Sequence, residues 1–563
     1  MATEFSFRTR AQSLDRMARS GSGQPYDLLV IGGGITGTAV ARDAVTRGLK
    51  VALVERNDFA YGTSSRSSKL IHGGLRYLEN FEFGLVFEAL SERSLLLKTV
   101  PHLVRPLPFY FPVYKEDLHG RFVLGMGMWL YDVLSLFRTP GFHKTLSRRR
   151  MLDAIPFLKK DGLKGGFRYF DASMWDDVMA IDVARAAVEG GADIANYAEA
   201  MEPVWDGAGE QKRLAGFTVR DLEKPSSAPI SVRARRVVVC AGPWADEFAR
   251  RIRPDWQPWI KPSKGIHLIF NLKRIPVPGA MVMSHPEDGR IAFVIPRPDY
   301  GPGVVIVGTT DTPTPDDPDQ ARAESSEVDY LLGLLNRYYP DLKLTRADII
   351  SHYVGVRPLM GQSGVGALQK VSREHHIDSG PGGCVLVAGG KYTTHRRMAE
   401  EIVDFALKGP EMKDVQARAP DTKPAANPAA LPVAIGFAQA RAGNEGVELP
   451  QKLIDRYGSD ALEIAREARD SKADPLSREM ADPEGFPCLV SQLRFAIRHE
   501  MVVHLEDFYL RRSALFLSRA DHGLPWAELL ARAWSLETGR SEADARAEIS
   551  RLQAECERRS RIV

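Results

Sequence analysis

Residues 26–56 read YDLLVIGGGITGTAVARDAVTRGLKVALVER, and the order of residue types in this stretch predicts a strand, a helix and a second strand. The largely apolar run Asp27–Ile31 is typical of a buried strand, and it continues directly into glycines. A segment of small residues follows, which predicts a helix, and Gly48 marks a turn before the second apolar run. The stretch therefore predicts a βαβ unit with parallel strands.

Three glycines in this unit have the spacing G-x-G-x-x-G: Gly32, Gly34 and Gly37. In such a motif the first glycine permits a tight turn, the second lets the backbone approach a pyrophosphate, and the third lets the helix pack on the strand. Glu55 ends the second strand 18 residues after the last glycine, where an acid accepts hydrogen bonds from a ribose. The unit therefore predicts a dinucleotide site; the alternative, a merely glycine-rich turn, leaves Glu55 unexplained.

The bulk composition excludes several classes of protein. The chain has 563 residues, and its 75 Lys and Arg against 72 Asp and Glu give a formal net charge of +3, so no overall field favours nucleic acid. No run reaches the roughly 18 apolar residues that a spanning helix needs. The four cysteines have neither metal-site nor paired spacing, which favours reduced, mostly structural thiols in a protein that faces the cytosol: Cys240, Cys384, Cys488 and Cys556.

The chain divides by composition into a leader, a long mixed region and a helical end. Residues 1–24 carry arginines but no apolar segment, which predicts a flexible leader and no secretory signal. Mixed helix and strand patterns continue to about Asp404. Residues 406–432 are rich in Pro, Ala and charge, which indicates a linker. Residues 433–563 show helical periodicity and no strand-like run, so a separate helical domain is expected.

A second stretch, TSSRSSKLIHGGLRYLEN at Thr63–Asn80, follows the βαβ unit directly. Its small hydroxyl side chains are suited to line a polar, extended ligand, and its two glycines let the backbone approach a flat ring. The alternative is a serine-rich surface loop. The hydroxyl residues are Thr63, Ser64, Ser67 and Ser68.

Seven short motifs occur in a fixed order along the chain: DLLVIGGGITG, TSSRSSKLIHGGLRYLE, AGPWAD, KGIHLIF, VGTTDT, YVGVRPL and GGKYTT. Together they resemble the respiratory, FAD-dependent glycerol-3-phosphate dehydrogenases over about Tyr26–Arg397. The segment IRHEMVVHLEDFYLRRS is similar to the distal helical part of the same family. No D-x-D-x-D-G loop is present, so a calcium site is not expected, and no other metal is predicted.

The resemblance implies an α/β fold like that of D-amino-acid oxidase. It would have a Rossmann-like FAD-binding domain, a substrate domain with an antiparallel sheet, and an added C-terminal all-α domain. The core would span residues 25–405, with FAD-binding segments near 25–75, 160–255 and 350–405 and substrate-domain segments near 76–159 and 256–349. The activity implied is oxidation of sn-glycerol 3-phosphate to dihydroxyacetone phosphate, with electrons passed through FAD to a membrane quinone, ubiquinone or menaquinone.

The resemblance also assigns positions to the cofactor. Besides the residues of the fingerprint and the hydroxyl stretch, it places further residues against FAD: Leu70, His72, Gly73, Gly242, Gly389, Lys391 and Thr394. Of these, Gly389 and Lys391 follow an apolar run in a strand-to-helix turn, where backbone amides and a positive charge would meet the reduced flavin.

Oxidation of a secondary alcohol needs a base near the hydroxyl proton, and neutral histidine is suited to that role. His267 in KGIH and His72 in LIHGG are the two candidates. Each also has a structural interpretation, as a hydrogen-bonded strand residue or as a residue packed on the flavin. The sequence leaves both open.

A phosphate dianion on the substrate calls for arginine, whose planar fork binds it bidentately. Arg76 and Arg357 match family positions that face the substrate, with Tyr77 as a hydroxyl donor. Lys391 adds positive charge, and Thr310 is a wall residue or simply part of a turn.

Residues 121–150 begin with RFVLGMGMWLYDVLSLFR, an apolar run bounded by arginines. This pattern suits a helix lying in the plane of a membrane surface as well as an ordinary buried helix. Resemblance favours the first, and implies a peripheral, monotopic homodimer on the cytoplasmic face of the inner membrane.

Three rival functions share some of these features. A soluble FAD-dependent amino- or hydroxy-acid oxidase would have the same fold and oxygen as acceptor. A flavin-containing sensor would bind FAD without turnover. An NAD dehydrogenase is disfavoured by the single nucleotide fingerprint.

Overall fold

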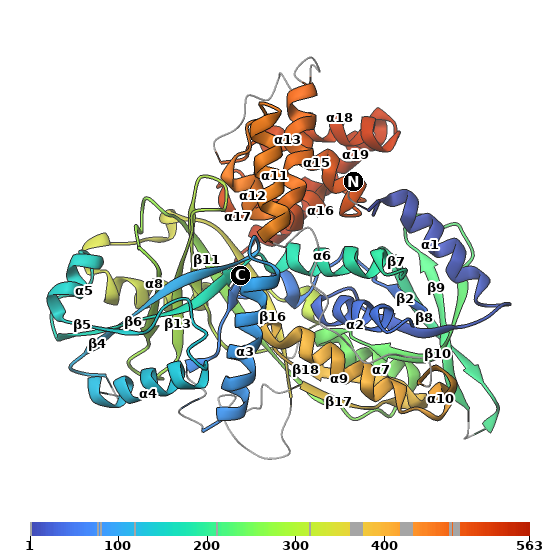
Figure 1. Cartoon of the computed structure of the whole chain (residues 1–563), viewed down its shortest axis with the longest axis horizontal. Helices are drawn as coiled ribbons and strands as arrows, with labels where there is room; N and C mark the ends of the chain where they lie inside the picture. The colour runs from blue at the N-terminus through green and yellow to red at the C-terminus, as the bar shows by residue number, and fades with distance from the viewer. Residues whose placement is uncertain are drawn as a thin grey trace.

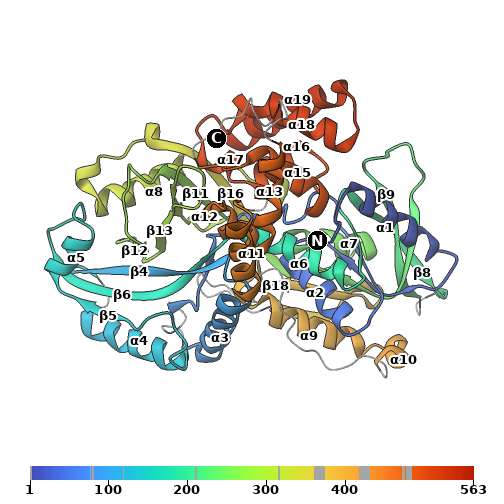
Figure 2. The ribbon, with the colours of Figure 1, turned by 45° about the horizontal axis from the view of Figure 1, so that its top comes forward.

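The computed structural model describes residues 3–75, 78, 81–117, 120–209, 212–314, 317–360, 375–416, 432–471, 476 and 485–563. In these ranges the chain forms two lobes, each built on a β-sheet, and a group of C-terminal helices (Figure 1). The helical group, drawn in orange and red, lies over the junction of the two lobes, and Figure 2 shows the same relation from a second direction.

An eight-stranded sheet forms the first lobe. Its main path runs in the order β17 (His375–Ser379), β18 (Val385–Gly389), β10 (Ile230–Val239), β1 (Tyr26–Ile31), β2 (Val51–Val54) and β7 (Asp193–Ala195). The strands from β18 to β7 are parallel to their neighbours, and β17 is an antiparallel edge. An antiparallel pair, β8 (Ala198–Asp206) and β9 (Arg213–Asp221), continues from β10.

Strand β1 is buried on both faces, which explains its continuous apolar sequence. Leu28 and Val30 join the core beneath α2 (Ile35–Thr46), α6 (Asp176–Glu189) and α9 (His395–Leu407). Leu29 and Ile31 join the opposite core, beneath α1 (Phe7–Arg19) and α7 (Ala245–Ile252). Successive side chains of a strand point to opposite faces, so one short run supports both layers. The predicted βαβ unit is confirmed.

A ten-stranded sheet forms the second lobe. Its main path runs in the order β15 (Thr312–Pro313), β11 (Ile260–Asn271), β14 (Val304–Gly308), β13 (Ile291–Arg297), β12 (Ala280–Ser284), β4 (Val104–Tyr114), β6 (Leu163–Met174) and β3 (Leu70–Ile71). Strand β16 (Ile349–Met360) pairs with β11, and β5 (Lys144–Leu146) pairs with β6. The pairings are antiparallel apart from β4 with β12. Helix α8 (Ser325–Tyr338) packs in the core on one face.

The C-terminal unit is helical, and its larger helices are α11 (Pro432–Asn444), α13 (Ala461–Asp470), α15 (Leu489–His499), α18 (Ala527–Thr538) and α19 (Glu542–Ser560). A π-helical turn at Phe508–Arg512 carries Arg511 and Arg512, which pair with the fully buried Asp58 of the first lobe. The final residue is tied to the second lobe, because the amide of Val563 donates to the carbonyl of Ala323 at 2.9 Å.

The structure differs from the predicted leader. Residues 7–19 form α1, and its Arg10 is fully buried, donates to the carbonyls of Asn196 and Tyr197 and pairs with Asp221. The prediction of a flexible segment was wrong, because the arginines that look solvated in sequence include one that is a buried hydrogen-bond donor.

Three predicted segment boundaries are also wrong. The short strand β3 falls within a segment assigned to the FAD-binding domain but pairs with β6 of the ten-stranded sheet. Strands β6 and β16 also fall within such segments, yet both belong to the ten-stranded sheet. A strand joins the sheet whose edge offers it partners, and each of these pairs along its length with a long neighbour, β4 or β11. Part of the predicted linker, Lys413–Gln416, forms the short helix α10, and residues 417–431 lie outside the described ranges.

Candidate functional site

The glycine fingerprint forms a sharp turn between β1 and α2. Gly32 has a φ of +107°, a conformation that favours glycine. A Cβ on Gly37 would overlap the carbonyl oxygen of Gly32, so only glycine lets α2 pack this closely. The helix begins after Gly34, and the Ile35 amide in its first turn donates to the hydroxyl of Ser64 at 2.9 Å. The turn thus presents the positive end of a helix to the space in front of it.

Glu55 lies at the end of β2, beside this turn. Its carboxyl oxygens accept hydrogen bonds from the amides of Gly33, at 2.6 Å, and Asn57, at 2.7 Å. Burial raises the pKa of this carboxyl, and the two amide donors oppose that effect. Two backbone bonds fix the side chain in place at the wall of the adjoining cavity.

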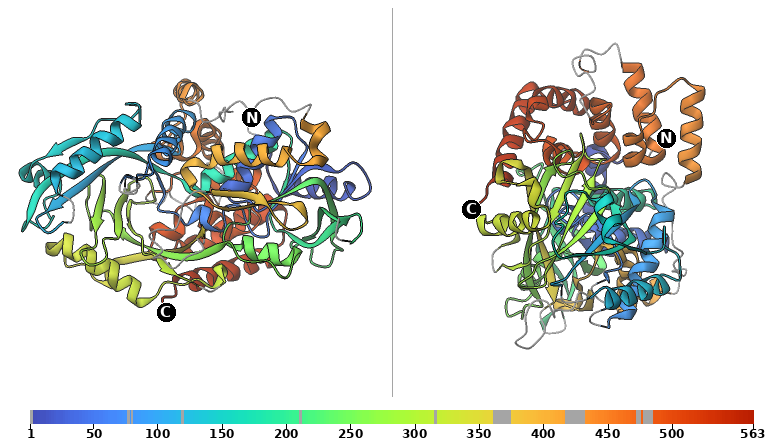
Figure 3. Two further views of the ribbon diagram at one scale, coloured as in Figure 1. Left: turned by 90° about the horizontal axis from the view of Figure 1, so that it is seen from below. Right: turned by 90° about the vertical axis from the view of Figure 1, so that its left-hand side faces the viewer.

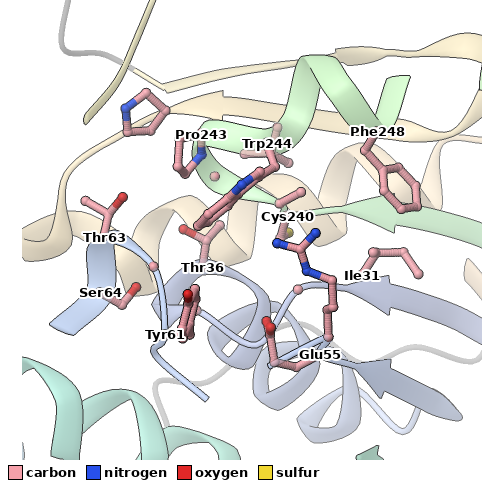
Figure 4. Close-up of a pocket in the computed structure, with 18 of the residues that line it drawn as sticks. Ile31, Thr36, Glu55, Tyr61, Thr63, Ser64, Cys240, Pro243, Trp244 and Phe248 are labelled. Carbon is pink, nitrogen blue, oxygen red and sulfur yellow. The ribbon is translucent and has the colours of Figure 1, made fainter. Parts of the chain in front are cut away.

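A cavity opens in front of the βαβ unit (Figure 4). Glu55 and Tyr61 lie on the side of the βαβ unit, and Pro243 and Trp244 lie across from them. Described residues from five separate parts of the chain line it, among them Gly32, Gly34, Thr36, Thr63, Ser64, Ser67, Glu199, Gly242, Arg251, Pro358, Gly389, Gly390, Lys391 and Tyr392. Most of the predicted cofactor residues of the fingerprint and of the later glycine turns therefore lie around one space.

Sequence reasoning missed several aromatic and charged residues of this cavity. Trp244 and Tyr61 have ring centroids 6.4 Å apart, and the guanidinium of Arg56 lies 5.8 Å from the Trp244 ring. The motif AGPWAD contains Trp244, so its position after a strand end was the available signal. Flat rings beside a dinucleotide site supply stacking surfaces.

The hydroxyls of the Thr63–Ser68 stretch bond to the protein and fix its shape. Thr63 donates to the carbonyl of Val356 at 2.6 Å, and Ser67 donates to the Asp176 carboxylate at 2.7 Å. The Ser68 hydroxyl lies 2.9 Å from Nε2 of His267. The prediction that they line the ligand space fits Thr63, Ser64 and Ser67, whereas Ser68 is not among the cavity-lining residues.

His267 is the best-defined histidine of the region. It is buried in β11, and its ring stacks on Tyr353 of β16 with centroids 4.6 Å apart and planes 9° apart. Burial, then Arg357 and Lys69, hold the pKa of the imidazole well below 6.5, so the ring is neutral at pH 7. Its Nδ1 is buried and, among the described residues, has no hydrogen-bond partner.

Lys69 is fully buried close to Tyr353. Its ammonium group pairs with Asp176 and lies 5.7 Å from the centroid of the Tyr353 ring, while the Tyr353 hydroxyl donates to the carbonyl of Ser67 at 2.7 Å. These contacts fix the positions of Tyr353 and His267 relative to Ser67 and Ser68, the residues just before Lys69 and β3.

Arg357 lies on β16, beside β11. Its guanidinium donates to the hydroxyl of Thr309 at 2.8 Å and pairs with Asp311 at 3.2 Å. Thr310 differs from its prediction as a substrate residue: its hydroxyl is buried, donates to Glu327 at 3.0 Å and accepts from the Ile266 amide at 3.1 Å. The turn alternates its side chains, so Thr309 rather than Thr310 faces the arginine.

The remaining predicted site residues lie in different surroundings. Gly73 is packed against Leu90 and Tyr131, and Leu70 is buried in β3. The hydroxyl of Thr394 is buried behind the Lys391 turn. His72 is half-buried, with its ring 6.5 Å from that of Phe293. Arg76 and Tyr77 lie outside the described residues.

The residues around the cavity fit FAD. The amides of the α2 turn suit a pyrophosphate, because they face open space at the positive end of a helix. Glu55 is placed to accept from ribose hydroxyls, and an acid at that position disfavours a 2′-phosphate. The turns at Gly242 and Gly389 close the space from the far side.

Two family models match the chain. The model described as FAD dependent oxidoreductase matches residues 27–404, and the C-terminal domain of alpha-glycerophosphate oxidase matches residues 433–545. The aerobic glycerol-3-phosphate dehydrogenase of Staphylococcus haemolyticus is 33% identical over 501 residues, covering 87% of each chain. That of Staphylococcus aureus strain MRSA252 is 33% identical over 503 residues, covering 87% of this chain and 86% of the relative.

Solved structures agree with this assignment. The FAD-complexed glycerol-3-phosphate dehydrogenase of Bacillus halodurans has a TM-score of 0.78 at 27% identity, covering 98% of this chain and 99% of the other. The L-proline dehydrogenase of P. horikoshii, with a TM-score of 0.50 at 16% identity over 70% of this chain, shares the fold of the two lobes. The predicted fold class is confirmed, and the chain belongs to the FAD-dependent oxidoreductases, in the family of the aerobic glycerol-3-phosphate dehydrogenases.

Proposed function

We propose that the protein oxidises sn-glycerol 3-phosphate to dihydroxyacetone phosphate and passes the two electrons to a membrane quinone. The observation that carries the proposal is a neutral, buried histidine and an arginine on neighbouring strands of the second lobe, where that lobe contacts the cofactor lobe, in a chain of this family. FAD, when bound, supplies the acceptor for the carbon-bound hydrogen.

His267 is the proposed acceptor of the hydroxyl proton. A base for this role must be neutral at the working pH and fixed in orientation. Burial and the nearby positive charges of Arg357 and Lys69 supply the first condition, and stacking on Tyr353 supplies the second. His72, which directly follows β3, stays the second candidate for the base.

Arg357 is the proposed phosphate ligand. Its guanidinium is about a quarter exposed and held by Thr309 and Asp311, so its fork is oriented before substrate arrives. Lys391, in the turn after β18, lines the same cavity as the fingerprint and is proposed to add positive charge near the flavin. Arg76 and Tyr77 remain proposed substrate residues on resemblance alone.

An exposed apolar surface supports delivery of electrons at a membrane. It lies on α4 (Arg121–Leu134) and the start of α3 (Phe83–Thr99), on the side of the molecule away from the C-terminal helices (Figures 1 and 3). Its large side chains are at least 40% exposed: Phe81, Phe83, Phe87, Phe122, Val123, Met126, Trp129 and Val133. In the described ranges, no helix combines the length and apolar character that crossing a bilayer takes.

Basic residues lie at the two ends of α4, where Arg121 begins the helix and Arg138 follows it, and both are exposed. Apolar anchors beside positive charge are the combination that holds a helix in the plane of an anionic lipid surface. The proposal is therefore a peripheral enzyme on the cytoplasmic face of the cell membrane. A homodimer is also proposed, and a monomeric mass by light scattering in detergent would contradict it.

The test is an anaerobic spectral titration of the purified protein. Glycerol 3-phosphate should bleach the yellow flavin absorbance, and a quinone analogue should restore it. If glycerol 3-phosphate leaves the spectrum unchanged while an amino or hydroxy acid bleaches it, the substrate assignment is wrong. If bleaching by glycerol 3-phosphate is reversed by oxygen with stoichiometric peroxide and not by quinone, the acceptor assignment is wrong.

A further inference from the structure

Three arginines surround the ring of Tyr61. The guanidinium carbons of Arg66, Arg511 and Arg559 lie 5.0, 5.9 and 6.0 Å from its centroid. Arg66 belongs to the hydroxyl stretch of the first lobe, whereas Arg511 and Arg559 come from the C-terminal helices. Tyr61 also lines the FAD cavity, so the cluster lies where the helical unit meets the wall of that cavity.

The three arginines of this cluster differ in how much negative charge lies beside them. Arg511 pairs with two carboxylates, those of Asp58 and Asp507. Arg559 shares the single carboxylate of Glu555 with Arg558, each at 2.6 Å.

Arg66 has the least compensating negative charge of the three arginines. The side chains that act most strongly on it are three arginines and Tyr61, with no carboxylate among them. Its Nε and Nη2, and Nη2 of Arg559, are buried and have no hydrogen-bond partner among the described residues.

Such an arrangement is unfavourable without a further partner. Burial, and then repulsion from Arg559, hold the pKa of Arg66 down to about 9. A buried guanidinium N–H group without an acceptor loses its hydration, and a trapped water would satisfy that group but leave the charge uncompensated. An oxyanion supplies both the acceptors and the charge, and paired guanidinium forks are the donors that bind phosphate best.

We propose that Arg66 and Arg559 form a binding site for an oxyanion of the phosphate class, at the interface between the first lobe and α19. The site is distinct from the FAD cavity, because neither arginine is among the described residues that line it. It is also distinct from the proposed substrate ligand Arg357. An anion there joins two units of the chain, and it acts on the cofactor through Tyr61, whose ring both sites share.

The test uses the FAD-loaded full-length protein with Arg357→Gln, which removes the proposed substrate phosphate ligand. Inorganic phosphate is titrated at constant ionic strength, with chloride as replacement, while flavin release on heating is followed by fluorescence. Arg66→Gln and Arg559→Gln are compared with Arg561→Gln, an exposed arginine two residues beyond Arg559 that removes the same charge. A second titration uses glucose 6-phosphate in place of inorganic phosphate.

Phosphate, and not chloride, should raise the release temperature, and the apparent Kd for phosphate should weaken by about tenfold or more in Arg66→Gln and in Arg559→Gln while Arg561→Gln matches the parent. If Arg66→Gln does not retain FAD, Arg559→Gln, at the rim of the cluster, decides alone. Equal effects of phosphate and chloride, or a phosphate effect unchanged by both substitutions, would overturn the proposal. Tighter binding of glucose 6-phosphate supports the site with a phosphorylated metabolite as ligand, and binding of inorganic phosphate alone supports it with the free ion.

Discussion

The substitution Gly37→Ala tests how the chain builds its cofactor site. A Cβ at this position overlaps the carbonyl oxygen of Gly32 and lies 3.1 Å from its carbon, inside ordinary contact distance. Neither partner is a flexible side chain, so the start of α2 has to move away from β1 by more than an ångström. The amides in the first turn of α2 move with it.

That displacement has a definite cost for FAD. An amide that donates to a phosphate oxygen at about 2.9 Å no longer makes a hydrogen bond at about 4 Å. A hydrogen bond to a charged group contributes roughly 1.5–3 kcal/mol, so the loss of one costs about 2 kcal/mol. We therefore expect the Kd for FAD to rise by about thirtyfold.

The assay is a titration of the apoprotein with FAD, followed by quenching of flavin fluorescence. The matched control is Gly333→Ala in α8, where a Cβ meets no other atom within 4 Å. This control should bind FAD like the parent, since it adds the same methyl group to a helix away from the site. A Kd for Gly37→Ala within threefold of the parent, with unchanged circular dichroism, would refute the reasoning.

Three further predictions concern turnover and membrane binding. The pKa of His267 is held well below 6.5, so the imidazole loses its ability to accept a proton only at lower pH. The value of kcat/KM should therefore stay level from about pH 8 to 6.5 and fall only at lower pH. A fall in kcat/KM that begins above pH 6.5 would show that another residue is the base. Arg357→Gln should raise KM for glycerol 3-phosphate by about a hundredfold with FAD content unchanged. The control Arg253→Gln, at an exposed arginine, should leave KM unchanged. If the two variants have the same KM, Arg357 does not bind the substrate. Trp129→Ala should lower partitioning onto anionic vesicles by about tenfold, and Leu536→Ala, at a leucine on α18 that is even more exposed, should not. Identical loss in both variants would indicate non-specific adsorption.

The cofactor half of the site was the more predictable part. Gly32, Gly37 and Glu55 lie within one local unit, so the physical role of each residue follows from its position in a strand–turn–helix. Gly32 and Gly37 have the turn and packing roles expected of them, because the interactions that fix these roles are short-range in sequence.

The rest depended on contacts that sequence patterns do not display. Thr310 and Thr309 are equivalent in the sequence, and only the turn geometry directs one into the core and the other to Arg357. The stacking of His267 on Tyr353 joins residues 86 positions apart through the pairing of β11 with β16. Arg10 looked solvated because its partners lie far along the chain.

The buried contact of Asp58 with Arg511 and Arg512 has a consequence for the order of synthesis. Asp58 follows Glu55 by three residues, yet its partners are made more than 450 residues later. Until then, the loop after β2 carries a carboxylate that lacks these counter-charges and must stay hydrated. A ribosome-bound chain that has completed the nucleotide fingerprint therefore still lacks two of the charges that hold the neighbouring loop, and these arrive only with the C-terminal helical unit.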